Sequence, residues 1–396
     1  MQPRWTVESE SGCTVRFADG VSALDLNSGL WNVPLGYRNA RVGEAVMAAM
    51  TVGSYGGVFR RSSVAAEEVA ERLVHLWPRG TYGKVLFATS GSAANDAVIK
   101  LSRLHRRRLG RSDRPVVVSF EGSYHGQTLG AMGLSGEDLL QGEMLTAPHE
   151  FVKVPVDDSD RVRQILDSHG TRISAVFIEP LQGTGTRPMD DAVLQEIFEA
   201  RRRHGFLVIA DEVATGFGRT GVMFRSARWR ESADLVVLSK ALTNGTQAAS
   251  AILVGSEVAD VFAAQGAIFP HGETQAGSLW ACAAMNAVLD EFEERFGMVT
   301  ADAQLPETRS MEQFLDKVSA PSMGLQVRGE GMFYTITGTE DFDGLAVGER
   351  LRSAGLVVHA GLHSIQLAPP FVLSHQQWAD AAETLKEELH RVCADG

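Results

Sequence analysis

Short apolar runs, rich in Val, Ile and Leu, recur through the middle of the chain, and each gives way to polar or charged residues. Runs of this length and composition predict buried strands of a parallel sheet. The runs concerned are 84–89, 116–118, 175–178, 206–210 and 235–238. Elsewhere apolar residues follow helical spacing, as at Val69, Leu73 and Leu76. The pattern predicts an α/β fold in which helices flank a mainly parallel sheet.

The two ends of the chain show a different pattern. Residues 14–26 form short apolar stretches around Asp19-Gly20, a dipeptide that favours a tight turn, and so predict a β hairpin. A helix is expected near 42–50. From about residue 290 the chain continues with helices, then strands, then an amphipathic helix that ends near Val392. We expect this C-terminal part to form a separate unit.

Two of the predicted strands end at residues that carry chemistry. The run 206–210 stops at Asp211, and the run 235–238 stops at Ser239-Lys240. In an open α/β sheet, ligands bind outside the carboxyl ends of the strands, so a carboxylate and an amine would face one crevice. A lysine that forms a Schiff base and an aspartate that pairs with a pyridinium nitrogen are what pyridoxal phosphate (PLP) requires. The alternative is two charges at a sheet edge with no joint role.

A small polar turn follows the strand 84–89. Residues 90–95 (SGSAAN) lead from this strand into a predicted helix. A helix N-terminus presents free N–H groups and the positive end of the helix dipole to a phosphate. The turn is therefore a candidate seat for the PLP phosphate, whereas simple helix capping is the alternative.

Several segments resemble the class III (fold type I) PLP-dependent aminotransferases, in particular the ω-transaminase branch. The longest is 211–221 (DEVATGFGRTG), in which Ala214 replaces a glutamine of the family pattern. The turn 90–95 is similar to S-G-(S/T)-E-A-N, with Ala93 in place of the acidic residue. The other similar segments are 122–126 (GSYHG), 179–183 (EPLQG), 239–245 (SKALTNG) and 271–278 (HGETQAGS).

The resemblance implies PLP as cofactor and assigns residues to it. Lys240 would hold the cofactor as a Schiff base and Asp211 would pair with its ring nitrogen, and these two are the expected catalytic residues. The other implied cofactor contacts are Gly91, Ser92, Ala93, Tyr124, His125, Glu179, Val213 and Thr274. Thr274 is expected to reach the phosphate of a neighbouring subunit, which implies a homodimer with shared active sites. Trp31, Arg60 and Gln366 are expected near the substrate, and no metal is expected.

The resemblance also implies the domain organisation. Fold type I has a large domain with a mainly parallel sheet of the seven-stranded type, and a small α+β domain built from both chain ends. We expect residues 1–50 to form the N-terminal part of the small domain, 51–289 the large PLP-binding domain, and 290–396 the C-terminal small domain.

Composition excludes several other classes. The 396 residues are 44% hydrophobic with a net charge of −12, which argues against nucleic-acid binding because such binding needs clustered Lys and Arg. The three cysteines have no metal spacing, and no signal peptide or membrane-length apolar run is seen, so we expect a cytoplasmic protein. A Rossmann dehydrogenase is disfavoured because no G-x-G-x-x-G follows the first strand.

The residue at position 366 indicates which class of substrate to expect. In relatives that act on α-amino acids, an arginine three residues before the first proline of a C-terminal Pro-Pro binds the substrate carboxylate, and here that residue is Gln366. A neutral amide lacks the charge-assisted fork, which is worth about 1.5–3 kcal/mol. We therefore expect an aminotransferase that moves an amino group between a donor amine or amino acid and a ketone or aldehyde, one substrate lacking an α-carboxylate.

Such substrates occur in ω-amine metabolism and in the tailoring of natural products or peptides. An amino-acid donor would still need a cation, for which Arg60, Arg61, Arg187 and Arg225 are candidates. A class III mutase, racemase or lyase would use the same Lys240 and Asp211. A scaffold protein that only binds PLP would have lost Lys240, so it is disfavoured.

Overall fold

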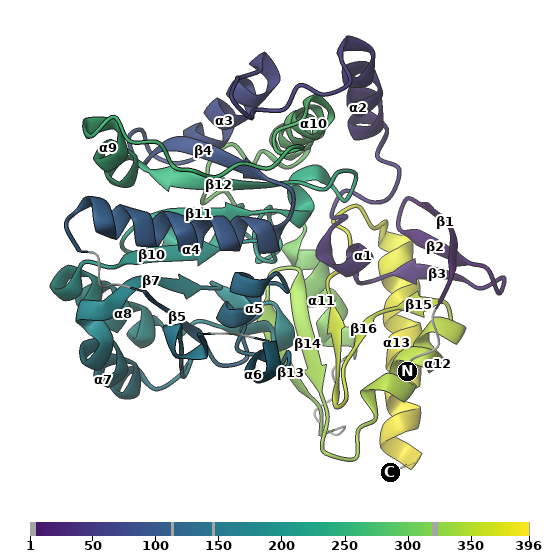
Figure 1. The fold of residues 1–396 in the computed structure, drawn as a ribbon. Helices are drawn as coiled ribbons and strands as arrows, with labels where there is room; N and C mark the ends of the chain where they lie inside the picture. The colour runs from purple at the N-terminus through teal and green to yellow at the C-terminus, as the bar shows by residue number, and fades with distance from the viewer. Residues whose placement is uncertain (1–4, 112–114, 145–146, 319–323, 396) are drawn as a thin grey trace.

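A seven-stranded sheet forms the centre of the chain (Figure 1). The structure is a computed structural model that describes residues 5–111, 115–144, 147–318 and 324–395. The strand order is β4-β12-β11-β10-β7-β5-β6, and every neighbouring pair is parallel except those that β12 forms with β11 and β4. The strands are β4 (Tyr82–Ala88), β5 (Val116–Phe120), β6 (Phe151–Val154), β7 (Ile173–Ile178), β10 (Leu207–Asp211), β11 (Leu235–Leu238) and β12 (Ser250–Gly255). The predicted α/β fold with a mainly parallel sheet is confirmed.

Helices bury both faces of this sheet, which explains why its strands are apolar without alternation. Leu207 and Ile209 of β10 share a core with α4, whereas Val208 shares a core with α8. The helices around the sheet are α3 (Val64–His75), α4 (Gly91–Arg108), α7 (Ser159–His169), α8 (Asp191–His204), α9 (Ser256–Ala264) and α10 (Leu279–Phe296). Because side chains of a strand alternate between faces, Asp211 points to the same side as Leu207 and Ile209, toward α4.

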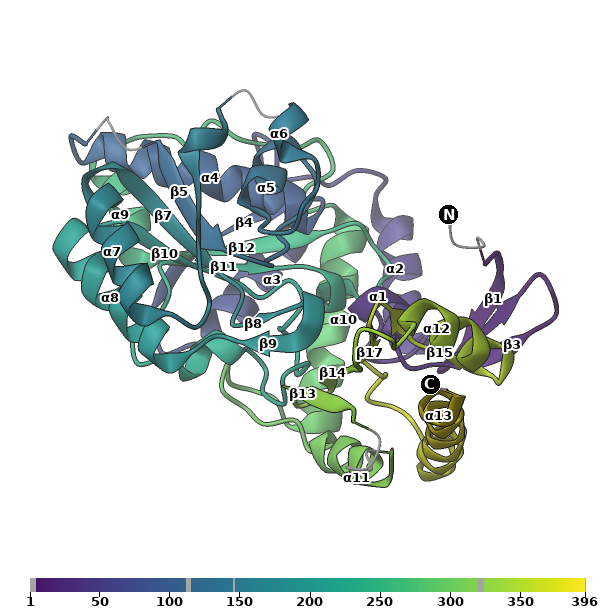
Figure 2. The ribbon, with the colours of Figure 1, turned by 90° about the horizontal axis from the view of Figure 1, so that it is seen from below.

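Both ends of the chain meet beside the large sheet (Figure 2). The predicted hairpin at 14–26 forms as β2 and β3, and β15 from the C-terminal part pairs parallel with β3. One small sheet has the order β1-β2-β3-β15 and the other β13-β14-β17-β16. Their strands are β1 (Val7–Ser11), β2 (Thr14–Phe17), β3 (Ser22–Asp25), β13 (Gln326–Glu330), β14 (Phe333–Thr337), β15 (Leu356–Val357), β16 (His359–Ala360) and β17 (Ser364–Leu367).

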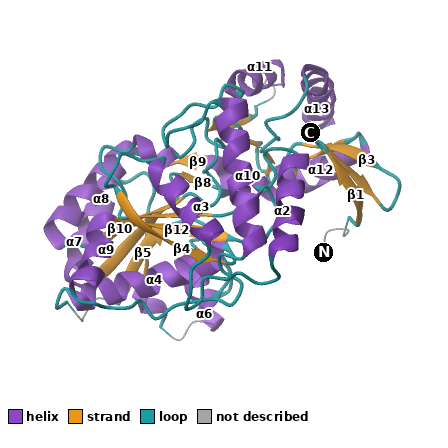
Figure 3. Cartoon of the chain, turned by 90° about the horizontal axis from the view of Figure 1, so that it is seen from above, coloured by secondary structure: helices purple, strands orange, loops and turns teal. Residues whose placement is uncertain are grey.

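The helix α2 (Ala40–Val52) lies beside α10 (Figure 3). Each of these helices runs across one of the predicted domain boundaries, so the division at 50 and 289 stays a prediction. The remaining helices are α1 (Ser28–Trp31), α5 (Leu129–Leu134), α6 (Gln141–Met144), α11 (Thr308–Val318), α12 (Gly344–Ser353) and α13 (His375–Asp395). A short two-stranded sheet pairs β8 (Leu181–Gln182) with β9 (Arg187–Pro188).

Cys13 and Cys282 are buried free thiols, and the side chain of Cys393 lies outside the described residues. Within the described ranges, no group of three or more His, Cys, Asp and Glu side chains is arranged to hold a metal ion. No helix in the described part of the chain has the length and apolar character needed to cross a membrane.

Candidate active site

The carboxyl ends of the large sheet and the start of α4 enclose a cavity of about 180 Å³. It is lined by Trp31, Gly91, Ser92, Asn95, Tyr124, His125, Gly126, Glu179, Asp211, Val213, Ala214, Ser239 and Lys240. The two predicted catalytic residues and most of the predicted cofactor contacts therefore lie around one space. Residues from Gly91 to Lys240 meet here because parallel strands end at the same edge of the sheet, and Trp31 of α1 joins them from the N-terminal part of the chain.

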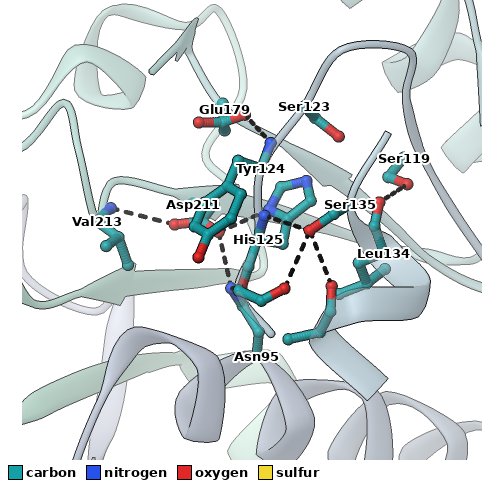
Figure 4. Close-up of polar contacts among 12 residues, drawn as sticks. Asn95, Ser119, Ser123, Tyr124, His125, Leu134, Ser135, Glu179, Asp211 and Val213 are labelled. Carbon is teal, nitrogen blue, oxygen red and sulfur yellow. Dashed lines mark hydrogen bonds and ion pairs between the residues drawn. The ribbon is translucent and has the colours of Figure 1, made fainter. Parts of the chain in front are cut away.

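Asp211 is fixed by three polar contacts at the end of β10 (Figure 4). Its Oδ2 accepts a hydrogen bond from Asn95 Nδ2 at 2.8 Å and contacts His125 Nδ1 at 2.7 Å. Its Oδ1 accepts from the Val213 amide at 3.1 Å. Only 3% of Asp211 is exposed, so these contacts replace water around the carboxylate and set its orientation. The contact from His125 Nδ1 thus helps to hold the Asp211 carboxylate in place.

Glu179 holds the loops on either side of the cavity. One carboxylate oxygen accepts from the Tyr124 amide at 2.9 Å and the other from the Gly183 amide at 3.0 Å. Burial raises the pKa of Glu179 to about 7, although His125 and the two amides act in the opposite direction. The Tyr124 and His125 loop is also held by Ser135, whose Oγ accepts from the His125 amide at 2.9 Å.

Lys240 places its amine against an aromatic ring. Its Nζ lies 4.3 Å from the centroid of the Trp31 ring, and its backbone has a φ of 47°, a conformation that L-residues rarely adopt. Burial lowers the pKa of Lys240 to about 8, while the nearby carboxylates of Asp211 and Glu179 oppose this shift. More of the amine is therefore neutral near neutral pH than in an ordinary lysine, as a nucleophile or general base requires.

The start of α4 forms an anion cradle. Ser90 caps the helix by accepting from the Ala93 amide at 3.1 Å, and helix geometry leaves the amides of Gly91 and Ser92 without intrahelical partners. A Cβ on Gly126 would lie 2.1 Å from Ser92 Oγ, so this approach requires glycine. The cradle therefore offers free N–H groups at the positive end of a helix that begins beside Lys240.

Four predicted residues do not line the cavity. Ala93 is one of them, and its amide donates to Ser90 Oγ at 3.1 Å in the first turn of α4. Thr274 is exposed in the loop before α10. Arg60 is exposed as well and lies 5.6 Å from the Phe59 ring. Gln366 is buried in β17, where its Nε2 donates to the Gly183 carbonyl at 2.5 Å. Gln366 is therefore not part of the lining, and its amide is held at Gly183, which lies against the cavity residues Trp31 and Ala214.

The other candidate arginines are also engaged elsewhere. Arg187 pairs with Asp157, Arg225 pairs with Glu330 at 2.9 Å, and Arg61 lies over the Tyr55 ring. No Arg or Lys apart from Lys240 lines the 180 Å³ cavity within the described residues. None of these three arginines lines the cavity, and neither does Arg60.

Sequence reasoning missed other residues of the site. Asn95 was not singled out, although it lies four residues after Gly91 and so shares the face of α4 that meets the cavity. Arg38 was missed too. It is exposed and lines a neighbouring cavity of about 610 Å³, whose lining also includes Ser239 and Lys240.

The residues present fit PLP. The amine of Lys240, the buried carboxylate of Asp211 and the cradle at Gly91 and Ser92 match the aldehyde, ring nitrogen and phosphate of that cofactor. Tyr124 and Val213 supply ring-packing surfaces at the same cavity.

Comparisons with known proteins agree with this geometry. The family model "Aminotransferase class-III" matches residues 1–389. A γ-aminobutyrate transaminase of Solanum lycopersicum is 29% identical, over 94% of this chain and 78% of its own length, and an acetylornithine aminotransferase of Corynebacterium efficiens is 29% identical, over 96% and 90%. A vanillin aminotransferase of Capsicum frutescens is 28% identical over 94% of this chain and 88% of its own length.

Solved structures give the same result. An (S)-enantioselective ω-transaminase from Thermomicrobium roseum superposes with a TM-score of 0.89 at 25% identity, covering 99% of this chain and 93% of that one. The ω-transaminase of Pseudomonas jessenii, in complex with PMP, also gives 0.89 at 25% identity, covering 98% and 93%. The chain therefore belongs to the class III aminotransferases, PLP-dependent enzymes of fold type I.

Proposed function

We propose that this aminotransferase uses Lys240 and Asp211 as its catalytic residues and that at least one of its substrates is an amine or ketone without an α-carboxylate. The observation that carries the substrate proposal is the lining of the cavity beside Lys240, which within the described residues contains no other Lys and no Arg. The residue that would supply the carboxylate fork in relatives is Gln366, and its amide is already bound to Gly183.

Each residue has a role that its surroundings support. PLP, when bound, supplies an electron sink for the negative charge that develops at the substrate carbon. Asp211 holds a fixed negative charge where the ring nitrogen would lie, with Asn95 and His125 keeping it in place. The amine of Lys240 would move a proton from the substrate carbon to the cofactor's C4′, which a lowered pKa favours. Gly91 and Ser92 bind the phosphate, and Tyr124 and Val213 pack on the ring.

The charge of the cavity lining limits which substrates the cavity can hold. A carboxylate taken into a cavity needs a cationic or multiply donating partner, because burying an unpaired charge is costly. Trp31, Ala214 and Val213 give the described cavity apolar walls that suit an uncharged substituent. One relative is named vanillin aminotransferase, and vanillin is an aldehyde without a carboxylate, which agrees with this proposal. An α-amino acid donor would need Arg38 or a residue of a second subunit.

The proposal extends to the assembly and setting of the enzyme. We infer a homodimer with shared active sites, because Thr274 lies outside the cavity of its own chain. We also propose the domain division 1–50, 51–289 and 290–396, a cytoplasmic location, and a place in ω-amine metabolism or in the tailoring of natural products or peptides.

Single-turnover measurements with matched donors test the substrate proposal. The cofactor-loaded protein is mixed with 2-phenylethylamine or with its parent L-phenylalanine, and conversion of PLP to its amine form is followed by absorbance. We expect the decarboxylated amine to react with the higher second-order rate constant, and Gln366→Arg to shift the ratio of the two rate constants toward the amino acid. Gln366→Met is the control, since it removes the contact with Gly183 without adding a charge. A strong preference for L-phenylalanine that Gln366→Arg leaves unchanged contradicts the proposal.

Product analysis separates the alternatives. A transaminase transfers nitrogen from a ¹⁵N-labelled donor to the acceptor. A mutase or racemase keeps the label in the donor skeleton, and a lyase breaks a bond of the donor without an acceptor.

A further inference from the structure

The segment that presents Trp31 to the cavity is a single turn of left-handed helix. Ser28, Gly29, Leu30 and Trp31 have φ angles of 48°, 55°, 60° and 67°. The turn closes through hydrogen bonds from the Trp31 amide to the Asn27 carbonyl and from the Asn32 amide to the Ser28 carbonyl, both 2.8 Å. Consecutive non-glycine residues rarely adopt this conformation, so the surrounding structure has to impose it.

Asp25 holds the turn from below. Its carboxylate accepts from the amides of Asn27 and Gly29, both at 2.7 Å, and from the hydroxyl of Tyr37 at 2.6 Å. Only 2% of Asp25 is exposed. The buried carboxylate of Asp25 thereby satisfies two backbone amides that have no partner within the left-handed turn.

Ser28 ties the same turn to the C-terminal part of the chain. Its Oγ donates to the Ala368 carbonyl at 2.6 Å and accepts from Arg219 Nη2 at 3.2 Å. Arg219 is buried, donates to the Pro369 carbonyl at 2.7 Å, and lies 4.8 Å from the Phe371 ring. The guanidinium therefore joins the turn to the segment after β17.

The end of the turn fixes the position of the Trp31 ring. The ring packs edge-on against Phe333 with a centroid distance of 4.9 Å, and a Cβ on Gly183 would lie 2.9 Å from it. On its cavity side it covers the amine of Lys240 at 4.3 Å. A small rotation of the turn would move this ring relative to the amine.

We propose that Asp25, Ser28 and Arg219 are positioning residues that hold residues 28–31 in the left-handed turn and thereby keep the Trp31 ring over the amine of Lys240. The turn determines how much of the space beside the reacting amine is open to an incoming amine. This proposal rests on the assignment of Lys240 made above.

A double-mutant cycle tests whether Ser28 acts through Trp31. The probe is phenylhydrazine, a carbonyl reagent that displaces Lys240 from bound PLP and gives a visible absorbance change without need of the natural substrate. We expect Ser28→Ala to raise the rate constant about fivefold because the ring no longer covers the amine, and to change it below about twofold when Trp31→Ala is also present. Ser174→Ala is the matched control, since Ser174 is a fully buried serine of β7 that donates to the Val116 carbonyl.

A second measurement uses the protein without cofactor. The fluorescence of Trp31 is obtained as the difference between wild type and Trp31→Phe, and acrylamide quenching reports its accessibility. We expect quenching of Trp31 to rise severalfold in Ser28→Ala and in Tyr37→Phe, which removes one donor to Asp25 and serves where Ser28→Ala does not fold. Ser174→Ala should leave it unchanged.

Equal rate changes in both backgrounds of the cycle, or unchanged Trp31 quenching in both variants, would overturn the proposal. Failure of the lysine assignment gives a different result: Lys240→Ala would then keep a borohydride-reducible covalent link to the cofactor. The quenching measurement tests the turn even in that case, because it involves no cofactor.

Discussion

Lys240 and Glu179 are titratable groups at the cavity. Burial shifts both pKa values toward neutral pH, from opposite directions. Burial lowers the pKa of Lys240 to about 8 and raises that of Glu179 to about 7. Charged forms are disfavoured in both cases, because each group has exchanged water for protein. Neutral lysine can attack a carbonyl carbon, and a protonated Glu179 puts less negative charge beside it.

The pKa of Lys240 predicts how cofactor capture depends on pH. Capture needs the neutral amine, so the rate at which cofactor-free protein binds PLP covalently should rise with pH and level off above about 8. An ordinary lysine, with a pKa near 10.4, would give a rate still rising at pH 9. Stopped-flow absorbance between pH 6 and 10, corrected for titration of free PLP, measures the profile. A midpoint near 10 would show that burial does not control this amine.

Replacing the lysine tests its covalent role. Lys240→Ala should abolish both the borohydride-reducible link to PLP and turnover, because no other lysine lines the described cavity. Mass spectrometry after reduction identifies the labelled peptide. Lys153→Ala is the comparison variant, since Lys153 is a partly buried lysine bonded to the Gly133 and Leu134 carbonyls and does not line the cavity. Wild-type turnover in Lys240→Ala would refute the assignment.

The raised pKa of Glu179 predicts a pH-dependent stability. Between about 4.5 and 7 the unfolded chain releases this proton while the folded chain keeps it, so the folded state loses stability relative to the unfolded state as pH rises through that window. Glu179→Gln cannot ionise, so its melting temperature relative to wild type should increase from pH 5 to 7 and stay level above. Thermal unfolding of the cofactor-free protein at several pH values checks this, and a pH-independent difference would count against it.

At the scale of elements, the parallel strands made the centre of the site predictable. Asp211, Glu179 and Lys240 each follow an apolar run, and such runs could be recognised as strands that end at one edge. The turn before α4 was predictable in the same way. The geometry of the Gly126 loop, in contrast, depends on Ser92 from another element, and no local pattern reports that contact.

The left-handed turn of α1 and the position of Gln366 could not be predicted either, because both depend on contacts between residues far apart in the sequence. The turn is imposed by Asp25 and by Arg219, which lies 191 residues from its partner Ser28. Gln366 was expected to face a substrate, yet it donates to Gly183, which is 183 residues away in the sequence. Three non-glycine residues in a left-handed turn cost about 1–2 kcal/mol each, so only tertiary contacts can stabilise it.

The contact between Gly126 and Ser92 gives a prediction about the anion cradle. Gly126 has a φ of 121°, and an added Cβ would lie 2.1 Å from Ser92 Oγ, so Gly126→Ala should push the Ser92 end of α4 away from the cavity. We expect PLP affinity to fall by about tenfold or more, a size typical of lost charge-assisted hydrogen bonds. Equilibrium dialysis measures it. Gly43→Ala, where a Cβ meets nothing within 4 Å, should leave affinity unchanged, and an equal loss there would remove the explanation.

At the scale of the whole molecule, exposed apolar side chains gather on the elements around Thr274. A cavity of about 1080 Å³ opens between β4, α3 and residues 268–273. The large apolar residues exposed on these elements and on the loop before α3 include Phe59, Val64 and Ile268. A patch of this kind marks an interaction surface, and a second copy of the chain is the partner that the proposed shared site requires.

Complementation between inactive variants tests the shared site. In a twofold dimer formed from Thr274→Ala and Lys240→Ala subunits, one site combines an intact Lys240 with the partner subunit's intact threonine, and the other site carries both defects. Random mixing should therefore restore about a quarter of wild-type activity, since half of the dimers are mixed and each has one working site.

The control pair is Lys240→Ala with Asp211→Ala. Both residues line the cavity of one chain, so every site in their mixed dimers keeps one defect and activity stays absent. Both parent variants have to be nearly inactive for the recovery to be read, and mass spectrometry of the intact assembly verifies that mixed dimers have formed. If Thr274→Ala is inactive and mixed dimers form without recovery, Thr274 serves its own chain, and the inference that each site is completed by the neighbouring subunit fails.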